Sequence, residues 1–245
     1  MSTLYTNARF WSAGQGIFHD LLVKDSIILA TGENVKEFTA ETTIDLNGAF
    51  VIPAFLDGHA HPIFAGREAA GPKINGINSI EEIKAQVKAF ALANPKIPWI
   101  IGGAYEAAII EGGDFDAKWL DEVVSDRPVV LHAVDHHTIW VNSKAIEVAG
   151  ITSATKDPQG GTIARNSDGS AKGTLREPSA MGLVLNHAPA NTIESDIAAI
   201  TYACAEYRKV GVIAAIDSWC EKDMARAYIV AAKTNQLTIA FNLSL

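Results

Sequence analysis

The hydrophobic pattern of the chain changes near residue 53, and this change limits the folds open to it. Before this position, short β-type segments alternate with turns such as Gly32 and Asn47-Gly48, which predicts a small antiparallel meander over residues 1–52. After it, strand-like apolar runs alternate with amphipathic helical segments, a pattern typical of βα units around a parallel sheet. We therefore expect an α/β body over residues 53–245.

Helix signals within this body are clear enough to place individual elements. The first begins at Ser79, where Ser79-x-x-Glu82 forms a capping box, and apolar residues recur at helical spacing until Asn94-Pro95. Further helices are expected over residues 116–125, 192–210 and roughly 222–234. Strands are expected over residues 99–101, 128–134, 210–216 and 237–243. A polar β-hairpin insertion is expected near residues 155–177, with Asp168-Gly169 as its turn.

Composition and charge narrow the range of partners. The 245 residues are 48% hydrophobic and carry a formal net charge of −8, which argues against a nucleic-acid backbone or an anionic membrane as the ligand. A small-molecule substrate is the expected partner. The two cysteines, Cys204 and Cys220, form no disulfide or metal pattern, so we expect a reducing compartment, the cytoplasm. We expect neither a signal peptide nor a membrane span.

Two histidines follow the apolar run Val51–Leu56 in the segment VIPAFLDGHAHP. His59 and His61 are two residues apart, so on a strand both imidazoles project to one face. Their position places them at the expected carboxyl end of a first barrel strand, and α/β barrels have their catalytic residues at this end of the strands. Imidazole nitrogens that converge on one point suit zinc or a similar divalent ion. The spacing alone is a weak signal, because two histidines can occur at this spacing by chance.

The segment IPAFLDGHAHP closely resembles the metal-binding motif that ends the first barrel strand in the amidohydrolase superfamily. Ala54 stands where that motif usually has glycine. The segments PWIIGGAYEA, DRPVVLHAVDHHTIWVNSKAIEVAGI and GGTIARNSDGSAKGTLRE are similar to successive pieces of the amidohydrolase family 3 branch, typified by N-substituted formamide deformylases. The resemblance covers nearly the whole chain. It implies a partial TIM-type (β/α) barrel after a small β-sandwich-like subdomain, the amino-terminal part of a composite urease-like sandwich.

The resemblance also implies a mechanism and a set of site residues. A divalent metal, zinc before iron, manganese or nickel, as one ion or two, would activate water for attack on an amide-type C–N bond that is not a peptide bond. His59 and His61 would be its first ligands, and Glu177 in LREPSA a further ligand or bridge with a catalytic role. An Arg-Glu-Pro sequence at the end of a hairpin is as often a surface turn. Asp57 is expected to brace the strand end or a ligand.

A second group of candidate residues lies in DHHTIWVNS. By the resemblance, His137 is expected at the substrate pocket with a catalytic role, and Trp140 and Asn142 are expected to contact substrate. The alternative for these residues is a strand-to-helix turn in which Asn142 or Ser143 caps the next helix. His132 is expected to be a packed core histidine, and His136 carries no functional expectation. Ile216-Asp217 falls where family members commonly have His-Asp.

The length of the chain leaves two hypotheses. Residues 53–245 supply 193 positions, whereas a full eightfold barrel needs about 250, and the family's later motifs, with two histidine ligands and an acid/base aspartate, are not found. In the first hypothesis the chain is the amino-terminal portion of an amidohydrolase, either a split enzyme completed by a second polypeptide or another copy, or a fragment of a longer chain. In the second it is a non-catalytic remnant or half-enzyme that binds metal or a complementing partner.

Overall fold

The computed structural model describes residues 1–244, which divide into two compact units. Unit 1 contains Met1–Leu56 and Gly211–Ile213, and unit 2 contains Asp57–Val210 and the chain from Ala214 onward. Within the described residues, none of the helices combines the length and the apolar composition that a membrane span requires.

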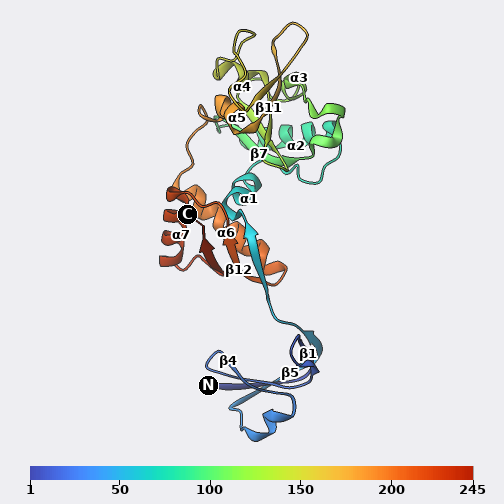
Figure 1. Ribbon diagram of the computed structural model, residues 1–245, viewed down its shortest axis with the longest axis vertical. Coiled ribbons are helices and arrows are strands. Elements are labelled where there is room, and N and C mark those ends of the chain that lie inside the picture. The colour runs from blue at the N-terminus through green and yellow to red at the C-terminus, as the bar shows by residue number, and fades with distance from the viewer. Residues whose placement is uncertain (245) are drawn as a thin grey trace. The chain divides into compact units, whose positions relative to one another are not determined.

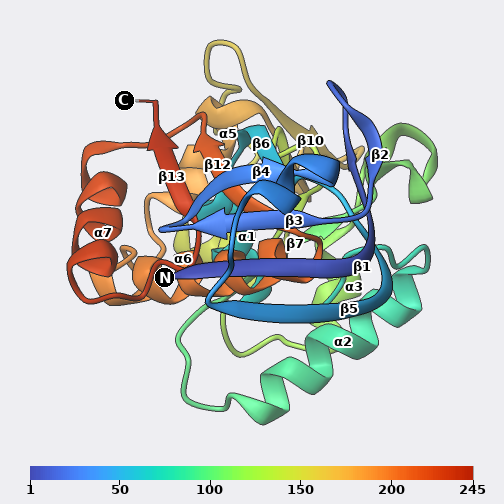
Figure 2. The ribbon, with the colours of Figure 1, turned by 90° about the horizontal axis from the view of Figure 1, so that it is seen from below.

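Unit 1 is built on one five-stranded sheet, whose longer strands run across the view in Figure 2. Its strands are β1 (Ser2–Ser12), β2 (Gly16–Phe18), β3 (Leu21–Lys24), β4 (Ile27–Thr31) and β5 (Thr42–Val51), and a 3₁₀ turn, η1, covers Gly32–Glu37. The prediction of a purely antiparallel meander was wrong, because β5 pairs with β1 in parallel. The chain reaches this pairing through η1, where the buried Val35 packs against Leu22 and Ala30 of β3 and β4.

Two further sheets lie in unit 2, except for their residues Phe55, Leu56, Val212 and Ile213, which belong to unit 1. The five-stranded sheet has the order β10-β11-β9-β8-β7, and the three-stranded sheet has the order β13-β12-β6. Their strands are β6 (Phe55–Ala60), β7 (Ile100–Tyr105), β8 (Val129–Ala133), β9 (Thr138–Val141), β10 (Thr162–Arg165), β11 (Ala171–Arg176), β12 (Val212–Asp217) and β13 (Ala240–Leu243). The pairs β7–β8 and β12–β13 are parallel, whereas β8–β9, β9–β11 and β10–β11 are antiparallel. The expected hairpin is therefore present, and it extends a sheet that begins with parallel strands.

Four of the described helices lie in the predicted ranges, whereas those at Pro62–Ala69 and Glu177–Leu185 were not predicted (Figure 1). They are α1 (Pro62–Ala69), α2 (Ile80–Ala93), α3 (Ala117–Asp121), α4 (Ser143–Val148), α5 (Glu177–Leu185), α6 (Ile193–Lys209) and α7 (Lys222–Lys233), with 3₁₀ turns at Ala107–Ile109 (η2) and Glu111–Gly113 (η3). The Ser79 hydroxyl accepts a hydrogen bond from the Glu82 amide, which confirms the predicted start of α2. A reciprocal capping box forms instead between Thr192 and Ser195 at the start of α6.

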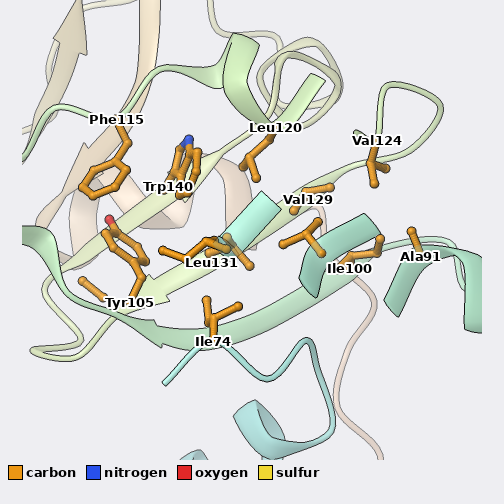
Figure 3. Close-up of a cluster of buried hydrophobic side chains, with 13 residues drawn as sticks. Ile74, Ala91, Ile100, Tyr105, Phe115, Leu120, Val124, Val129, Leu131 and Trp140 are labelled. Atoms are coloured by element: carbon orange, nitrogen blue, oxygen red, sulfur yellow. The ribbon is translucent and has the colours of Figure 1, made fainter. Parts of the chain in front are cut away.

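Two close packings hold unit 2 together around β7 and α1. In the core between β7, β8 and β9, the rings of Tyr105, Phe115 and Trp140 pack edge to face or tilted, with centroids 4.7 to 6.0 Å apart (Figure 3). At the second packing, a Cβ added to Gly66 of α1 would lie 2.3 Å from the Ala199 carbonyl oxygen of α6. Only glycine permits this approach of the two helices. The contact fixes α1, which directly follows β6 in the chain, against α6.

Candidate metal and catalytic site

His59 and His61 lie where β6 ends and α1 begins. His59 is the second-last residue of the strand, and His61 is the residue before Pro62, the first residue of α1. The two imidazole rings are 5.3 Å apart between centroids and nearly perpendicular. Asp57 Oδ1 accepts a hydrogen bond of 3.1 Å from the His59 amide, so Asp57 braces the strand end as expected. The sequence thus brings both imidazoles to the carboxyl end of one strand.

The Nδ1 atom of His61 is buried and has no hydrogen-bond partner among the described residues. The nearest carboxylate is that of Asp217, whose Oδ1 lies 4.0 Å from this nitrogen and whose side chain is 1% exposed. This separation is too long for a hydrogen bond. A buried polar atom without a partner is costly, and a cation bound at the site would relieve that cost. The residues present therefore fit a metal ion at this end of β6.

Two tyrosines hold the carboxylates beside the histidines. Tyr228 of α7 donates a hydrogen bond of 2.8 Å to Asp217 Oδ2, and Tyr207 of α6 donates one of 3.0 Å to Asp57 Oδ2. Burial, followed by the hydrogen bond to each carboxylate, raises the pKa of both phenols. Both tyrosines therefore stay protonated and donate. Their contacts fix one oxygen of each carboxylate. The other oxygen of Asp217, Oδ1, accepts a hydrogen bond of 3.2 Å from the Trp219 amide and lies 4.0 Å from His61 Nδ1.

A second cluster of possible ligands lies nearby in unit 2. Glu68 of α1, His132 of β8 and His136 offer ligand atoms that all lie within 4.8 Å of one another. Burial raises the pKa of Glu68 to about 7 and lowers that of His132 to about 4. Burial and, to a lesser extent, the proximity of His61 lower the pKa of His136. At neutral pH both imidazoles are therefore neutral, the form in which a histidine binds a metal.

One residue of each group lines the same cavity. His61 and Glu68 both line this cavity of about 820 Å³, together with Gly103 and Tyr207. The ring of Phe64 lies 6.1 Å from that of His61 and 6.3 Å from that of His136, measured between centroids. A volume of this size accommodates a small-molecule ligand.

His137 and Glu177 form an exposed pair. His137 Nδ1 lies 3.0 Å from Glu177 Oε2, and the Glu177 amide donates a hydrogen bond of 2.7 Å to the His137 carbonyl. The hydrogen bond to Glu177 raises the pKa of His137. Glu177 has a φ of 68°, a left-handed conformation that is uncommon for a residue with a side chain and that clusters at functional sites. No ion pair or hydrogen bond in residues 1–244 joins Glu177 to His59 or His61.

Trp140 and Asn142 are fully buried. The indole nitrogen of Trp140 donates a hydrogen bond to the Asp116 carbonyl, and Asn142 caps α4 through the Ala145 amide. The strand-to-helix turn considered as the alternative for this segment is therefore present, with Asn142 as the cap. The predicted contact of these two side chains with substrate stays a prediction.

Glu68, His136 and Asp217 are site residues that sequence reasoning missed. Glu68 and His136 are far apart in the chain and belong to no motif that links them, so nothing in the sequence indicates their proximity. His132 was expected to be a core residue, and its ring is indeed largely buried. Asp217 carried a usable signal, because it ends β12, which lies beside β6 in the three-stranded sheet. Residues at the carboxyl ends of neighbouring barrel strands share one edge.

Comparison with known proteins decides the family. A sequence profile described as the amidohydrolase family matches residues 42–242, most of the chain. The chain belongs to the amidohydrolase family. This confirms the resemblance drawn from the segment around His59 and His61.

Two curated relatives and one solved structure show the extent of the likeness. Protein YtcJ of Bacillus subtilis (strain 168) is 36% identical over 173 residues, which are 68% of this chain and 32% of YtcJ. The N-substituted formamide deformylase of Arthrobacter pascens is 28% identical over 140 residues, 56% of this chain and 26% of the deformylase. An uncharacterized metal-dependent hydrolase from Pyrococcus horikoshii OT3 shares the fold with a TM-score of 0.70 at 20% identity, over 100% of this chain and 48% of that one. The amidohydrolase chain thus spans about a third or less of these curated relatives.

The solved structure confirms the predicted fold class. The chain is an α/β protein with a partial TIM-type (β/α) barrel and a small amino-terminal β-subdomain.

Proposed function

We propose that this amidohydrolase cleaves an amide-type C–N bond, other than a peptide bond, in a small-molecule substrate by means of a metal-activated water. The observation that carries the proposal is the buried Nδ1 atom of His61, which has no partner in the described chain and lies at the carboxyl end of β6 beside Asp217. Family membership adds the reaction class, and the cavity lined by His61 supplies room for a substrate.

In this proposal His59 and His61 hold a divalent ion, zinc before iron, manganese or nickel. The ion would supply an activated water, with its pKa lowered to about 7, and would polarise the substrate carbonyl. Tyr228 and Tyr207 keep the carboxylates of Asp217 and Asp57 oriented beside the two imidazoles. Their role is that of outer hydrogen-bond partners, which orient groups next to a metal and tune its affinity.

Glu177 and His137 are proposed to act together. Their hydrogen bond of 3.0 Å stabilises the charged form of His137, which suits proton transfer to a leaving nitrogen. Glu177 is further proposed as a metal ligand or bridge, supported by its left-handed backbone rather than by a contact with the histidine pair. A complementary segment that carries the family's later motifs would supply the acid/base aspartate. The free, buried cysteines favour a reducing compartment such as the cytoplasm.

A hydroxamate provides a test that does not require turnover, because it combines an amide-like carbonyl with a metal-chelating oxygen. The full chain loaded with Zn²⁺ is titrated with N-hydroxyformamide and acetohydroxamate by calorimetry. We expect binding to the loaded parent and at least tenfold weaker binding to the His59→Ala, His61→Ala double variant. The matched control, His187→Gln, is expected to bind as the parent does. Equal binding in the chelator-treated parent or in the double variant would refute the proposal.

A further inference from the structure

The cluster of Glu68, His132 and His136 shares no residue with the His59–His61 pair. We propose that these three side chains form a second divalent-cation site, one that takes zinc or a similar borderline ion. Its three ligand atoms already lie within 4.8 Å of one another. Around a tetrahedral zinc with bonds of about 2.1 Å, ligand atoms lie about 3.4 Å apart. The ligand atoms therefore need to approach one another by no more than about 1.4 Å to hold an ion.

Three separate segments converge to build this cluster. Glu68 comes from α1, His132 from β8, and His136 from the turn that follows β8, where its φ of 58° is left-handed. A Cβ added to Gly103 of β7 would lie 2.4 Å from Glu68 Oε1, so the glycine provides the space that the carboxylate occupies. The backbone of β7 is thus shaped to receive a carboxylate from α1.

The carboxylate of Glu68 is not satisfied by the protein. Its Oε1 atom is buried without a hydrogen-bond partner among residues 1–244, and the side chain is only 16% exposed. His136 Nδ1 lies 3.5 Å from this oxygen but forms no hydrogen bond with it. In those residues no lysine or arginine forms an ion pair with Glu68. A buried carboxylate without donors is costly, and a cation shared with two imidazoles removes that cost.

The donor set indicates the class of ion. Two imidazole nitrogens and one carboxylate oxygen suit Zn²⁺, and also Fe²⁺ or Co²⁺, better than Ca²⁺ or Mg²⁺, which prefer oxygen ligands alone. Three protein ligands leave a further position on the ion for water or for an oxygen of a ligand. Glu68 also lines the cavity that His61 lines, so this open position is accessible to a small molecule in the cavity.

Cobalt titration of the full chain tests the proposal without any assay of turnover. The protein is stripped with a chelator, and the number and affinity of bound Co²⁺ ions are followed by d–d absorption and by competition with Zn²⁺. On the His59→Ala, His61→Ala background we expect one Co²⁺ per chain to remain. Adding Glu68→Gln or His136→Gln to this background should weaken that ion at least tenfold. His187→Gln and Glu147→Gln are matched controls outside the cluster and should leave it unchanged.

The outcomes separate this site from the proposed hydrolase site. If the double histidine variant binds no Co²⁺, or if Glu68→Gln and His136→Gln leave its affinity unchanged, the second site does not exist. If Glu68→Gln and His136→Gln abolish binding while the double histidine variant matches the parent, the second site stands and the assignment of His59 and His61 fails. His136 is 46% exposed at its side chain, so His136→Gln is expected to fold, and circular dichroism in chelator checks each variant.

Discussion

The Asn142→Ala substitution tests whether this buried amide is structural. Asn142 Oδ1 accepts hydrogen bonds of 3.0 Å from the amides of Val129 and Ala145. Its Nδ2 donates hydrogen bonds of 2.9 Å to the carbonyls of Val124 and Arg127. Truncation to alanine removes partners from four backbone groups in a fully buried position. One side chain thus ties the end of α3 and the start of β8 to the start of α4.

The expected cost follows from these four contacts. A buried group that loses its partner costs about 1 to 3 kcal/mol, and partial relaxation or entry of water reduces the sum, so we expect a loss of about 3 to 5 kcal/mol in the free energy of unfolding. Loss of a helix cap alone would cost about 1 kcal/mol. The larger value is a substantial share of the 5 to about 15 kcal/mol that stabilises a typical domain.

Urea unfolding followed by tryptophan fluorescence measures this cost. The control is Ser143→Ala at the next residue, which is exposed and whose hydroxyl bonds only to Asp121; a loss below about 1 kcal/mol is expected for it. A loss below about 1 kcal/mol for Asn142→Ala as well would refute the reasoning, and would return Asn142 to the predicted role in substrate binding.

Three further predictions concern the groups around the site. In chelator, the free energy of unfolding of the parent should fall as pH rises from 4.5 to above 7, because folding raises the pKa of Glu68 to about 7 and the folded state binds its proton more tightly. Glu68→Gln should remove this loss, so thermal melts at pH 8 should show the variant more stable than the parent by on the order of 2 kcal/mol. Identical pH profiles for the two proteins would contradict the explanation. Cys204 and Cys220 are buried, and burial raises the pKa of Cys220 to about 11, so a disulfide reagent at pH 7.5 should modify neither thiol rapidly in the native protein and both in denaturant. Tyr228→Phe removes the hydrogen bond that holds Asp217 and should lower the metal affinity of the site at His61 about tenfold in a chelator competition. An unchanged affinity would show that this hydrogen bond does not influence metal binding.

The sequence predicted α2 and α6 well because their ends carry local signals, whereas α1 and α5 were missed. Ser79 and Thr192 cap α2 and α6 through hydrogen bonds within the first turn, so their starts depend on neighbours in the chain. Strand β9 (Thr138–Val141) was not predicted as a separate element, since a short apolar run of this length has no distinctive period. The parallel pairing of β5 with β1 was also missed, because pairing direction depends on the tertiary path of the chain.

Only part of the candidate site could be predicted. The His59 and His61 pair was found because both residues lie in one short motif next to an apolar strand. Glu68 and His136 come from segments that meet only when α1 packs against β7, a contact that depends on the absence of a side chain at Gly103. A contact between segments this far apart in the chain produces no hydrophobic periodicity that a single sequence could reveal. Asp217 could have been found from the adjacency of its strand to β6.

The metal content of the purified chain tests the central claim most directly. The full chain and its His59→Ala, His61→Ala double variant are equilibrated with Zn²⁺, and the bound ions per chain and their affinities are measured by elemental analysis and chelator competition. We predict that the parent binds an ion which the double variant binds at least about tenfold more weakly, the scale found even for loss of outer partners of a metal ligand. Equal content and equal affinity in the two proteins would contradict the assignment of this pair as metal ligands.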